Sequence, residues 1–232
     1  MTDGTGSTDR RSMLSRLGIG AAALGAGIGV IPAQAQTAVS SRFQPAQYPQ
    51  DDWFDQLKGS HRFVIDSTTP DGGGTALAFA NNFFAANKSG YGLDPAALAV
   101  IIVLRHFSTP FAYNDAVWAK YSAQIFELTK FADPKTVQPP KTNLYNSAAY
   151  GLTLPNFGTT IDSLVNQGVH FAVCDMATHF FAGYLAEQTK GDAGTVYREL
   201  TENLIRNAHL VPAGIVAVNR AQEHGYTFAY AA

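Results

Sequence analysis

The sequence has very little cysteine, with Cys174 as the single one among 232 residues. One cysteine cannot form an intramolecular disulfide, so a disulfide framework is excluded. The paired cysteines of common structural zinc sites and the CxxCH motif of covalently attached haem are missing too. Cys174 is therefore a small buried side chain, a link between chains, or a reactive thiol.

Charge is also sparse and nearly balanced. Lysine and arginine number 16, aspartate and glutamate number 18, and the net charge is −2. No basic cluster follows the N-terminal segment, which argues against nucleic acid as a partner. No apolar run beyond that segment reaches the roughly 20 residues of a membrane-spanning helix, so we predict no membrane span in the mature protein.

Several catalytic and cofactor motifs are missing as well. The sequence has no Gly-x-Ser-x-Gly elbow, no HExxH and no P-loop. GAGIG at 25–29 imitates a nucleotide-binding loop, but no strand pattern precedes it. Cys174, His106 and His179 are chemically suited to copper or zinc, yet their spacing matches no recognised metal framework. The sequence therefore predicts neither a metal nor a cofactor.

The N-terminal residues are typical of an export signal. Arg10 and Arg11 precede an apolar run rich in glycine and alanine, which ends on AQA at 33–35, the small-x-small pattern of a signal peptidase site. Paired arginines indicate the twin-arginine (Tat) pathway, with an ordinary Sec signal or an uncleaved anchor as alternatives. We predict a signal peptide over 1–35, recognition by the Tat export machinery and a periplasmic mature protein.

The remainder predicts one α/β domain over 60–232, after an arm or linker over 36–59 in which Trp53 and Phe54 are candidate anchors. Strand patterns alternate with helical ones, which favours a mostly parallel sheet with helices on both faces. The segment 132–158, which contains several prolines, is predicted to be an irregular insertion and a candidate flap over a site. Predicted strands are 61–66, 98–105, 169–175 and 226–231, and predicted helices are 75–90, 114–131, 159–168, one from about 178, 193–208 and 212–224.

Reactive side chains follow the predicted strands. In an open parallel sheet, ligands bind beyond the carboxyl ends of the strands. Cys174 lies at such an end, where the positive N-terminus of the next helix would stabilise a thiolate. His106 could take the thiol proton or hold an anion, and Arg105 could pair with an anion. Asp66 ends the first strand and should converge with them. The structural alternatives are a helix cap for His106 and a salt bridge for Arg105.

Two further segments are candidates for anion binding. The glycine turn after the first strand brings the amides of Gly73 and Gly74 to the same edge, although a flexible turn before a helix at Thr75 explains it equally. Thr178 and His179 open the helix after Cys174. Thr178 is either a cap or an anion contact, and His179 faces either the site or solvent.

The other histidines are predicted to be structural. His170 lies within the strand that ends at Cys174, on the same face by alternation, which favours a packed core histidine over a ligand. His209 and His224 flank or end predicted helices, where histidine is an ordinary residue.

Three segments together resemble one family. They are NQGVHFAVC and VCDMAT, which share Cys174, and LVPAGIVAVNRAQEHGYTFAY near the C-terminus. In this order, over about residues 60–231, they are similar to the DsrE/DsrF-like sulfur-relay family, most closely to its exported branch. The resemblance implies a flavodoxin-like α/β fold and a homo-oligomer, a trimer or a hexamer. It also implies that Cys174 carries persulfide sulfur between a donor and an acceptor protein.

Two functions from different classes remain open at this point. The first is a periplasmic sulfur carrier or sulfurtransferase, with Cys174 as the persulfide acceptor and His106 and Arg105 assisting. The second is a noncatalytic oligomeric module that binds a small ligand, a metal or haem near His106, with Cys174 as a structural residue. Accessibility of the Cys174 thiol in the folded protein separates them, because only an accessible thiolate can accept sulfur.

Overall fold

The computed structural model describes residues 44–232, and those from Pro45 to Ala232 form one compact unit. The predicted signal peptide at 1–35 and the first part of the predicted arm lie outside the described residues. Within the described part, no helix combines the length and the apolar character that crossing a membrane requires.

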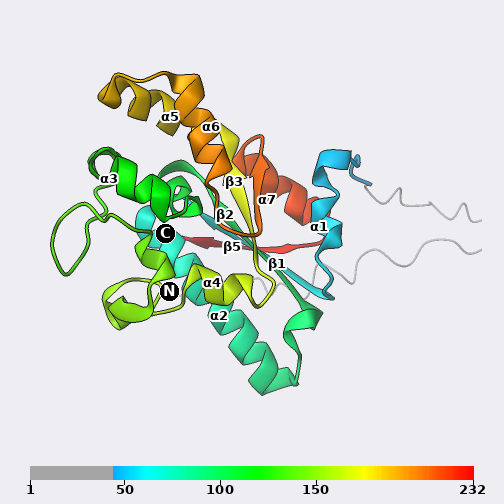
Figure 1. Cartoon of the computed structure of the whole chain (residues 1–232). Helices are drawn as coiled ribbons and strands as arrows, with labels where there is room; N and C mark the ends of the chain where they lie inside the picture. The colour runs from blue at the N-terminus through cyan, green and yellow to red at the C-terminus, as the bar shows by residue number, and fades with distance from the viewer. Residues whose placement is uncertain (1–43) are drawn as a thin grey trace, which may run out of the picture. The chain divides into compact units, whose positions relative to one another are not determined.

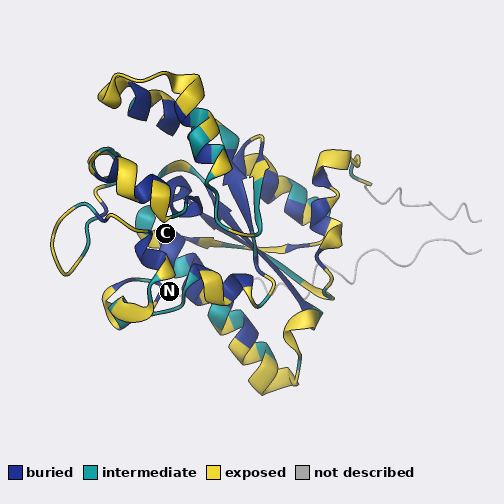
Figure 2. Cartoon of the chain, in the orientation of Figure 1, coloured by how far each residue is buried: buried dark blue, intermediate teal, exposed yellow. Residues whose placement is uncertain are grey.

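A five-stranded, all-parallel sheet forms the centre of the unit (Figure 1). Its order is β4-β3-β2-β1-β5. The central β2 is buried along its whole length, as expected for an apolar run between two paired neighbours. Figure 2 shows the inner strands as buried. The strands are β1 (His61–Ser67), β2 (Leu98–Leu104), β3 (His170–Cys174), β4 (Ala208–Val211) and β5 (Thr227–Ala231).

Helices cover both faces of the sheet, because alternate strand residues point to opposite sides. Val64 and Ile101 pack under α1 and α7, whereas Ile65 and Ile102 belong to the larger core under the other helices. This confirms the predicted α/β class, a parallel sheet between two layers of helices as in flavodoxin-like folds. The helices are α1 (Trp53–Gln56), α2 (Pro70–Tyr91), α3 (Asp115–Thr129), α4 (Ile161–Val165), α5 (Asp175–Thr189), α6 (Ala193–Glu202) and α7 (Gly214–Glu223).

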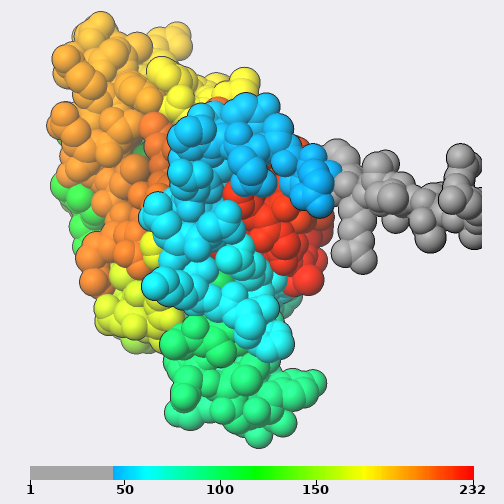
Figure 3. Space-filling view, turned by 90° about the vertical axis from the view of Figure 1, so that its right-hand side faces the viewer, coloured from blue at the N-terminus to red at the C-terminus, as the bar shows by residue number. Residues whose placement is uncertain are grey.

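The described part of the N-terminal arm belongs to the domain and is anchored as predicted. Trp53 and Phe54 are 8% and 1% exposed and pack in the α7-side core. The hydroxyl of Tyr226 donates a hydrogen bond to the Phe54 carbonyl at 2.7 Å. Figure 3 shows this blue N-terminal segment lying beside the red C-terminal part of the chain.

Two predicted boundaries are wrong for identifiable reasons. The predicted turn before Thr75 is the first turn of α2, because Thr69 caps the helix by accepting a hydrogen bond from the Gly72 amide, and Pro70 follows at the first helical position. The helix predicted over 193–208 ends at Glu202 in the structure, and Ala208 is instead the first residue of β4. That strand is short, lies at an edge and is mostly half-exposed, so its sequence lacks a continuous apolar run.

The insertion at 132–158 is irregular, as predicted, and contains the short 3₁₀ helices η4 (Leu144–Asn146) and η5 (Ala148–Thr153). Its anchor is Tyr145, which is fully buried and stacks obliquely on Phe111 with ring centroids 4.4 Å apart. The Tyr145 hydroxyl donates a 2.8 Å hydrogen bond to the carbonyl of Pro70. The insertion is thereby fixed against the start of α2.

Candidate functional site

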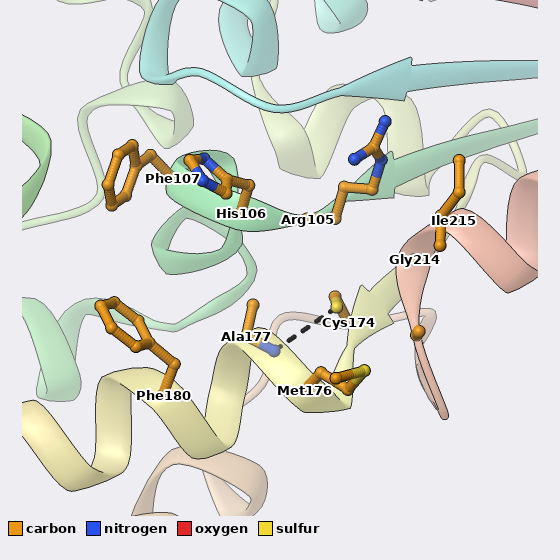
Figure 4. Close-up of a pocket in the computed structure, with 10 residues that line it drawn as sticks. Arg105, His106, Phe107, Cys174, Met176, Ala177, Phe180, Gly214 and Ile215 are labelled. Atoms are coloured by element: carbon orange, nitrogen blue, oxygen red, sulfur yellow. Dashed lines mark hydrogen bonds between the residues drawn. The ribbon is translucent and has the colours of Figure 1, made fainter.

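A cavity of about 310 Å³ opens at the carboxyl edge of the sheet, where β2 and β3 end beside the start of α7 (Figure 4). Arg105 and His106 directly follow β2, and Cys174 is the last residue of β3. All three line the cavity, so the structure brings these predicted site residues together. Parallel pairing of β2 with β3 produces this convergence, because both chains end in the same direction.

Cys174 occupies the junction between β3 and α5. It is the N-cap residue of α5, and its Sγ accepts a hydrogen bond from the Ala177 amide at 3.4 Å, drawn as a dashed line in Figure 4. The residue is 7% exposed. An amide donor and the positive end of a 15-residue helix both stabilise negative charge on the sulfur. The thiol thus lies at the wall of a cavity in surroundings that favour an anion.

A buried hydrogen-bonded relay fixes this junction. The Tyr113 hydroxyl donates to Thr178 Oγ1 at 3.2 Å, and Thr178 Oγ1 donates to the Cys174 carbonyl at 3.0 Å. Burial raises the pKa of Tyr113 well above its ordinary value, so its hydroxyl remains protonated and able to donate. Thr178 is completely buried and does not line the cavity. Its position is that of a structural support, not of the predicted anion contact.

Arg105 is held by Asp66 in a two-pronged ion pair. Its Nε and Nη2 donate to the two carboxylate oxygens of Asp66, each at 2.8 Å. These bonds raise the pKa of Arg105 above its ordinary value. Asp66 is 2% exposed and lies outside the cavity lining, where it orients the guanidinium. Among the described residues, no partner hydrogen-bonds to Nη1 of Arg105.

His106 lines the same cavity from an unusual backbone conformation. Its φ of 55° lies in the left-handed region, at the start of the 3₁₀ helix η3 (His106–Ala112). Ser108 stabilises the turn because its Oγ accepts a 3.0 Å hydrogen bond from the Arg105 amide. The His106 ring lies edge-on to Phe107, with centroids 4.2 Å apart. No hydrogen bond joins His106 to Cys174 in the described part of the chain.

Most of the cavity wall is apolar. Phe107 comes from η3, Met176 and Phe180 come from α5, and Ile215 comes from α7. Figure 4 shows Phe107 and Phe180 at one end of the cavity and Ile215 at the other. Within the part of the chain that the structure describes, no lining residue apart from Arg105 and His106 has an ionisable nitrogen or oxygen in its side chain. The site therefore combines one thiol, one cation and one imidazole with a hydrophobic surface.

Sequence reasoning missed the contributions of α5 and α7 to this wall. Sequence patterns predict helices over 193–208 and 212–224 and no element between them, so they do not predict the strand β4, whose carboxyl end leads into α7. Parallel pairing of β3 with β4, including Cys174 opposite Val211, brings the start of α7 to the site. Met176 and Phe180 could have been found from sequence, because i and i+4 positions share one helix face.

Gly73 and Gly74 do not form the predicted anion cradle. They lie inside α2, and a Cβ on Gly74 would approach the Tyr145 side chain to 2.7 Å. Gly74 therefore makes room for the insertion anchor. A Cβ on Gly73 would lie 3.6–3.7 Å from Phe111, Ser108 and Tyr145, which is ordinary contact. The insertion itself contributes no residue to the Cys174 cavity, so it is not a flap over this site.

His179 also lies outside the cavity. Its ring stacks on Tyr197 with centroids 4.0 Å apart, and its Nε2 lies 3.7 Å from Asp175 Oδ2. Tyr197 in turn donates a 2.8 Å hydrogen bond to Asp175 Oδ1. This cluster links α5 to α6 and holds His179 outside the cavity lining.

His170 and His209 form a pair at the other end of β3. Nδ1 of His170 and Nε2 of His209 share a 2.8 Å hydrogen bond, and Trp53 stacks on His209 with centroids 4.1 Å apart. Burial lowers the pKa of His170, and burial together with His170 lowers that of His209 to about 4. His170 is therefore packed, as expected, although it is half-buried at the start of the strand.

Metal ligands are not clustered in the described part of the chain. No group of three or more histidine, cysteine, aspartate or glutamate side chains has an arrangement there that could hold a metal ion.

Comparison with known proteins leaves the site to be interpreted from its own geometry. The sequence matches no model of a known protein family, and no curated protein matches it. A solved structure with some similarity is a protein of unknown function from Methanobacterium thermoautotrophicum. Its TM-score is 0.36 and its sequence identity is 14%, over 73% of this chain and 98% of the other.

Proposed function

We propose that this protein is a sulfur carrier that holds a persulfide on Cys174. The observation that carries the proposal is the position of Sγ, in the cavity wall and within hydrogen-bond distance of the Ala177 amide at the N-terminus of α5. A cavity gives a donor access to the sulfur, and the helix N-terminus stabilises the thiolate before transfer and the persulfide anion after it.

The transfer is an exchange between sulfur atoms and requires no oxidant. The Cys174 thiolate attacks the terminal sulfur of a donor persulfide, so that a new Sγ–S bond forms. The S–S bond of the donor breaks, and the donor leaves as a thiolate with the electron pair of that bond. His106, which lines the same cavity, takes the proton of the Cys174 thiol, and the positive charge of Arg105 stabilises the departing anion.

The cellular setting is part of the same proposal. The paired arginines and the AQA pattern support Tat-dependent export, which would make the mature protein periplasmic. The segments around Cys174 and near the C-terminus support a trimeric or hexameric homo-oligomer that exchanges sulfur with donor and acceptor partners. Size-exclusion chromatography with light scattering on the exported protein tests the assembly directly.

The first prediction concerns the thiol itself. After inorganic polysulfide is added to the folded protein, intact mass spectrometry should show a gain of sulfur that a reductant reverses. Cys174→Ser should show no gain, and His106→Gln should gain sulfur more slowly because the proton acceptor is missing. Gly183→Ala, at an exposed position of α5 that does not line the cavity, is the matched control and should behave as the native protein.

One result would overturn the proposal. If the native protein gains no sulfur, and its thiol reacts with an alkylating reagent only after denaturation, Cys174 is a structural residue. The noncatalytic module with a ligand site near His106 would then be the better description.

A further inference from the structure

The charge inside the Cys174 cavity is almost fully compensated. Among the described residues, Arg105 is the only permanently cationic one that lines the cavity, and both carboxylate oxygens of Asp66 are already bonded to it. Among the described residues only Nη1 of its guanidinium has no hydrogen-bond partner, so Arg105 offers a ligand at most one free nitrogen. A site for thiosulfate, sulfite or another inorganic dianion needs several convergent, uncompensated donors, because desolvating such an ion is costly. The cavity does not supply them.

The mouth of the cavity exposes large apolar side chains from two different elements. Met176 and Phe180 on α5 are 70% and 54% exposed, and Ile215 on α7 is 57% exposed. Together with the partly buried Phe107, they make a hydrophobic wall beside Cys174 (Figure 4). Such a surface gains free energy when an apolar group covers it, and contiguous exposed patches of this kind mark binding sites.

We propose that the sulfur donor for this cavity is a small organic persulfide with an uncharged, apolar substituent, such as an arylalkyl or alkyl group. The inference rests on the proposed sulfur-carrier function and adds the chemical class of the substrate. The volume of about 310 Å³ is at the lower end of small-ligand sites, which suits a single ring or a short chain.

Recognition and chemistry then use different side chains of the cavity. The substituent packs on the apolar wall, formed by Phe107 and Phe180 at one end and by Ile215 at the other, while the terminal sulfur of the persulfide reaches Sγ of Cys174. When the donor S–S bond breaks, the organic thiolate leaves with the electron pair of that bond, and the positive charge of Arg105 in the lining stabilises its single negative charge. The products are the Cys174 persulfide and the organic thiol, so atoms and electrons balance without a co-reactant.

The test compares three donors on the full-length folded protein. Benzyl persulfide, inorganic polysulfide and thiosulfate are added separately, and the initial rate of sulfur gain on Cys174 is followed by intact mass spectrometry. Each rate is divided by the rate at which glutathione reacts with the same donor, which removes differences in intrinsic reactivity. Burial of one phenyl ring should favour benzyl persulfide by about tenfold or more over both inorganic donors.

Variants in the wall connect the preference to the cavity. Phe180→Gln and Ile215→Gln replace exposed residues, so they should fold normally, and they should lower the normalised rate with benzyl persulfide several-fold more than the rate with polysulfide. Phe79→Gln is the matched control, because Phe79 is 42% exposed on α2 and does not line the cavity. It should leave both rates unchanged.

The outcomes separate this inference from the function on which it rests. Sulfur gain from polysulfide or thiosulfate with a normalised rate equal to that with benzyl persulfide would overturn the apolar substrate class and leave the carrier function standing. No sulfur gain from any of the three donors would overturn both. A preference that survives unchanged in Phe180→Gln and Ile215→Gln would also refute the cavity as its origin.

Discussion

The packing of the site requires a glycine at position 214. It is the first residue of α7, and a Cβ built there would lie 2.5 Å from Cβ and 2.8 Å from Cδ of Arg105. Real Cβ atoms do not approach other atoms so closely. The missing side chain therefore lets α7 begin against the stem of Arg105, while Asp66 holds the guanidinium from the other direction.

Gly214→Ala should consequently strain the site. Either Arg105 or the first turn of α7 must move, and we expect a loss of about 1–3 kcal/mol in the free energy of unfolding, as for overpacked positions. Urea unfolding measures this loss. The rate of sulfur gain on Cys174 should fall as well, because Arg105 moves with the clash.

Gly183→Ala provides the opposite expectation on a neighbouring helix. No atom lies within 4 Å of a Cβ at this exposed position in α5, so alanine should stabilise the protein by about 0.5–1 kcal/mol through its higher helix propensity. If Gly214→Ala were equally harmless, the close approach to Arg105 would not constrain the site.

The residues of the site differ in how far the sequence predicts them. Cys174, Arg105 and His106 each follow an apolar run, so parallel strands alone suffice to bring them together. The role of Thr178 depends on which way its side chain turns, and the buried Tyr113 hydroxyl that orients it is 65 residues away in the chain. Long-range contacts of this kind leave no local pattern in a sequence.

At the scale of elements, the insertion at 132–158 is a structural brace. Tyr145 packs on Phe111, lies over Gly74 and bonds to Pro70, which joins the insertion to the first turn of α2. From sequence, glycines after a strand predict an anion site as readily as a packing site, because both need an absent side chain. The two kinds of site are distinguished only by what lies against the glycine, an anion or, as at Gly74, the side chain of another residue.

Tyr145→Ala should remove that brace without opening the site. We expect a loss of about 3–5 kcal/mol in the free energy of unfolding, typical of an emptied aromatic core position. Leu152→Ala, at an 84% exposed position in the same insertion, should change it little. Under native conditions, alkylation of Cys174 should proceed at the native rate in both variants. A marked acceleration in Tyr145→Ala alone would show that the insertion covers the cavity after all.

The strand β4 and the helix α7 show why element boundaries fail together. If residues 193–208 are predicted as one helix, the strand that pairs with β3 is missing from the prediction. The position of α7 beside Cys174 then cannot be predicted either, because α7 follows that strand. The actual strand has four residues, and its position at the edge leaves it without the apolar signature that made β2 easy to predict.

At the scale of the whole molecule, the two ends of β3 have different chemistry. Cys174 faces the cavity at the carboxyl end, whereas the His170–His209 pair holds the N-terminal arm at the amino end through Trp53. The arm also contacts the C-terminal region, because Asp55 forms a 2.8 Å bond with His224. The arm is therefore attached through residues that do not line the cavity.

The histidine pair makes stability depend on pH. The pKa of His209 is about 4 in the folded protein and 6.5 in its ordinary state, and that of His170 is lowered as well. As the pH falls, the two histidines are protonated in the unfolded chain before they are protonated in the folded protein. The stabilisation that the neutral pair gives the folded protein is therefore present above pH 6.5 and is lost toward pH 4.

Urea unfolding midpoints between pH 7 and pH 4 test this expectation. His209→Phe keeps an aromatic ring against Trp53 but cannot be protonated, and its midpoint should fall less than that of the native protein. His61→Gln, at an exposed histidine, should follow the native curve. Protonation of carboxylates lowers the midpoint equally in all three proteins. If the midpoint of His209→Phe fell with pH as steeply as that of the native protein, the histidine pair would not be the source of the pH dependence.

The same stack gives the molecule an optical property. Of the two tryptophans, Trp118 is completely buried among phenylalanines, whereas Trp53 lies flat against the His209 imidazole with an angle of 9° between the rings. A charged imidazolium quenches indole emission by electron transfer, but a neutral one hardly does. The intrinsic fluorescence of Trp53 is thus a label-free indicator of the charge state of the pair, recorded while the cavity on the opposite edge is left untouched.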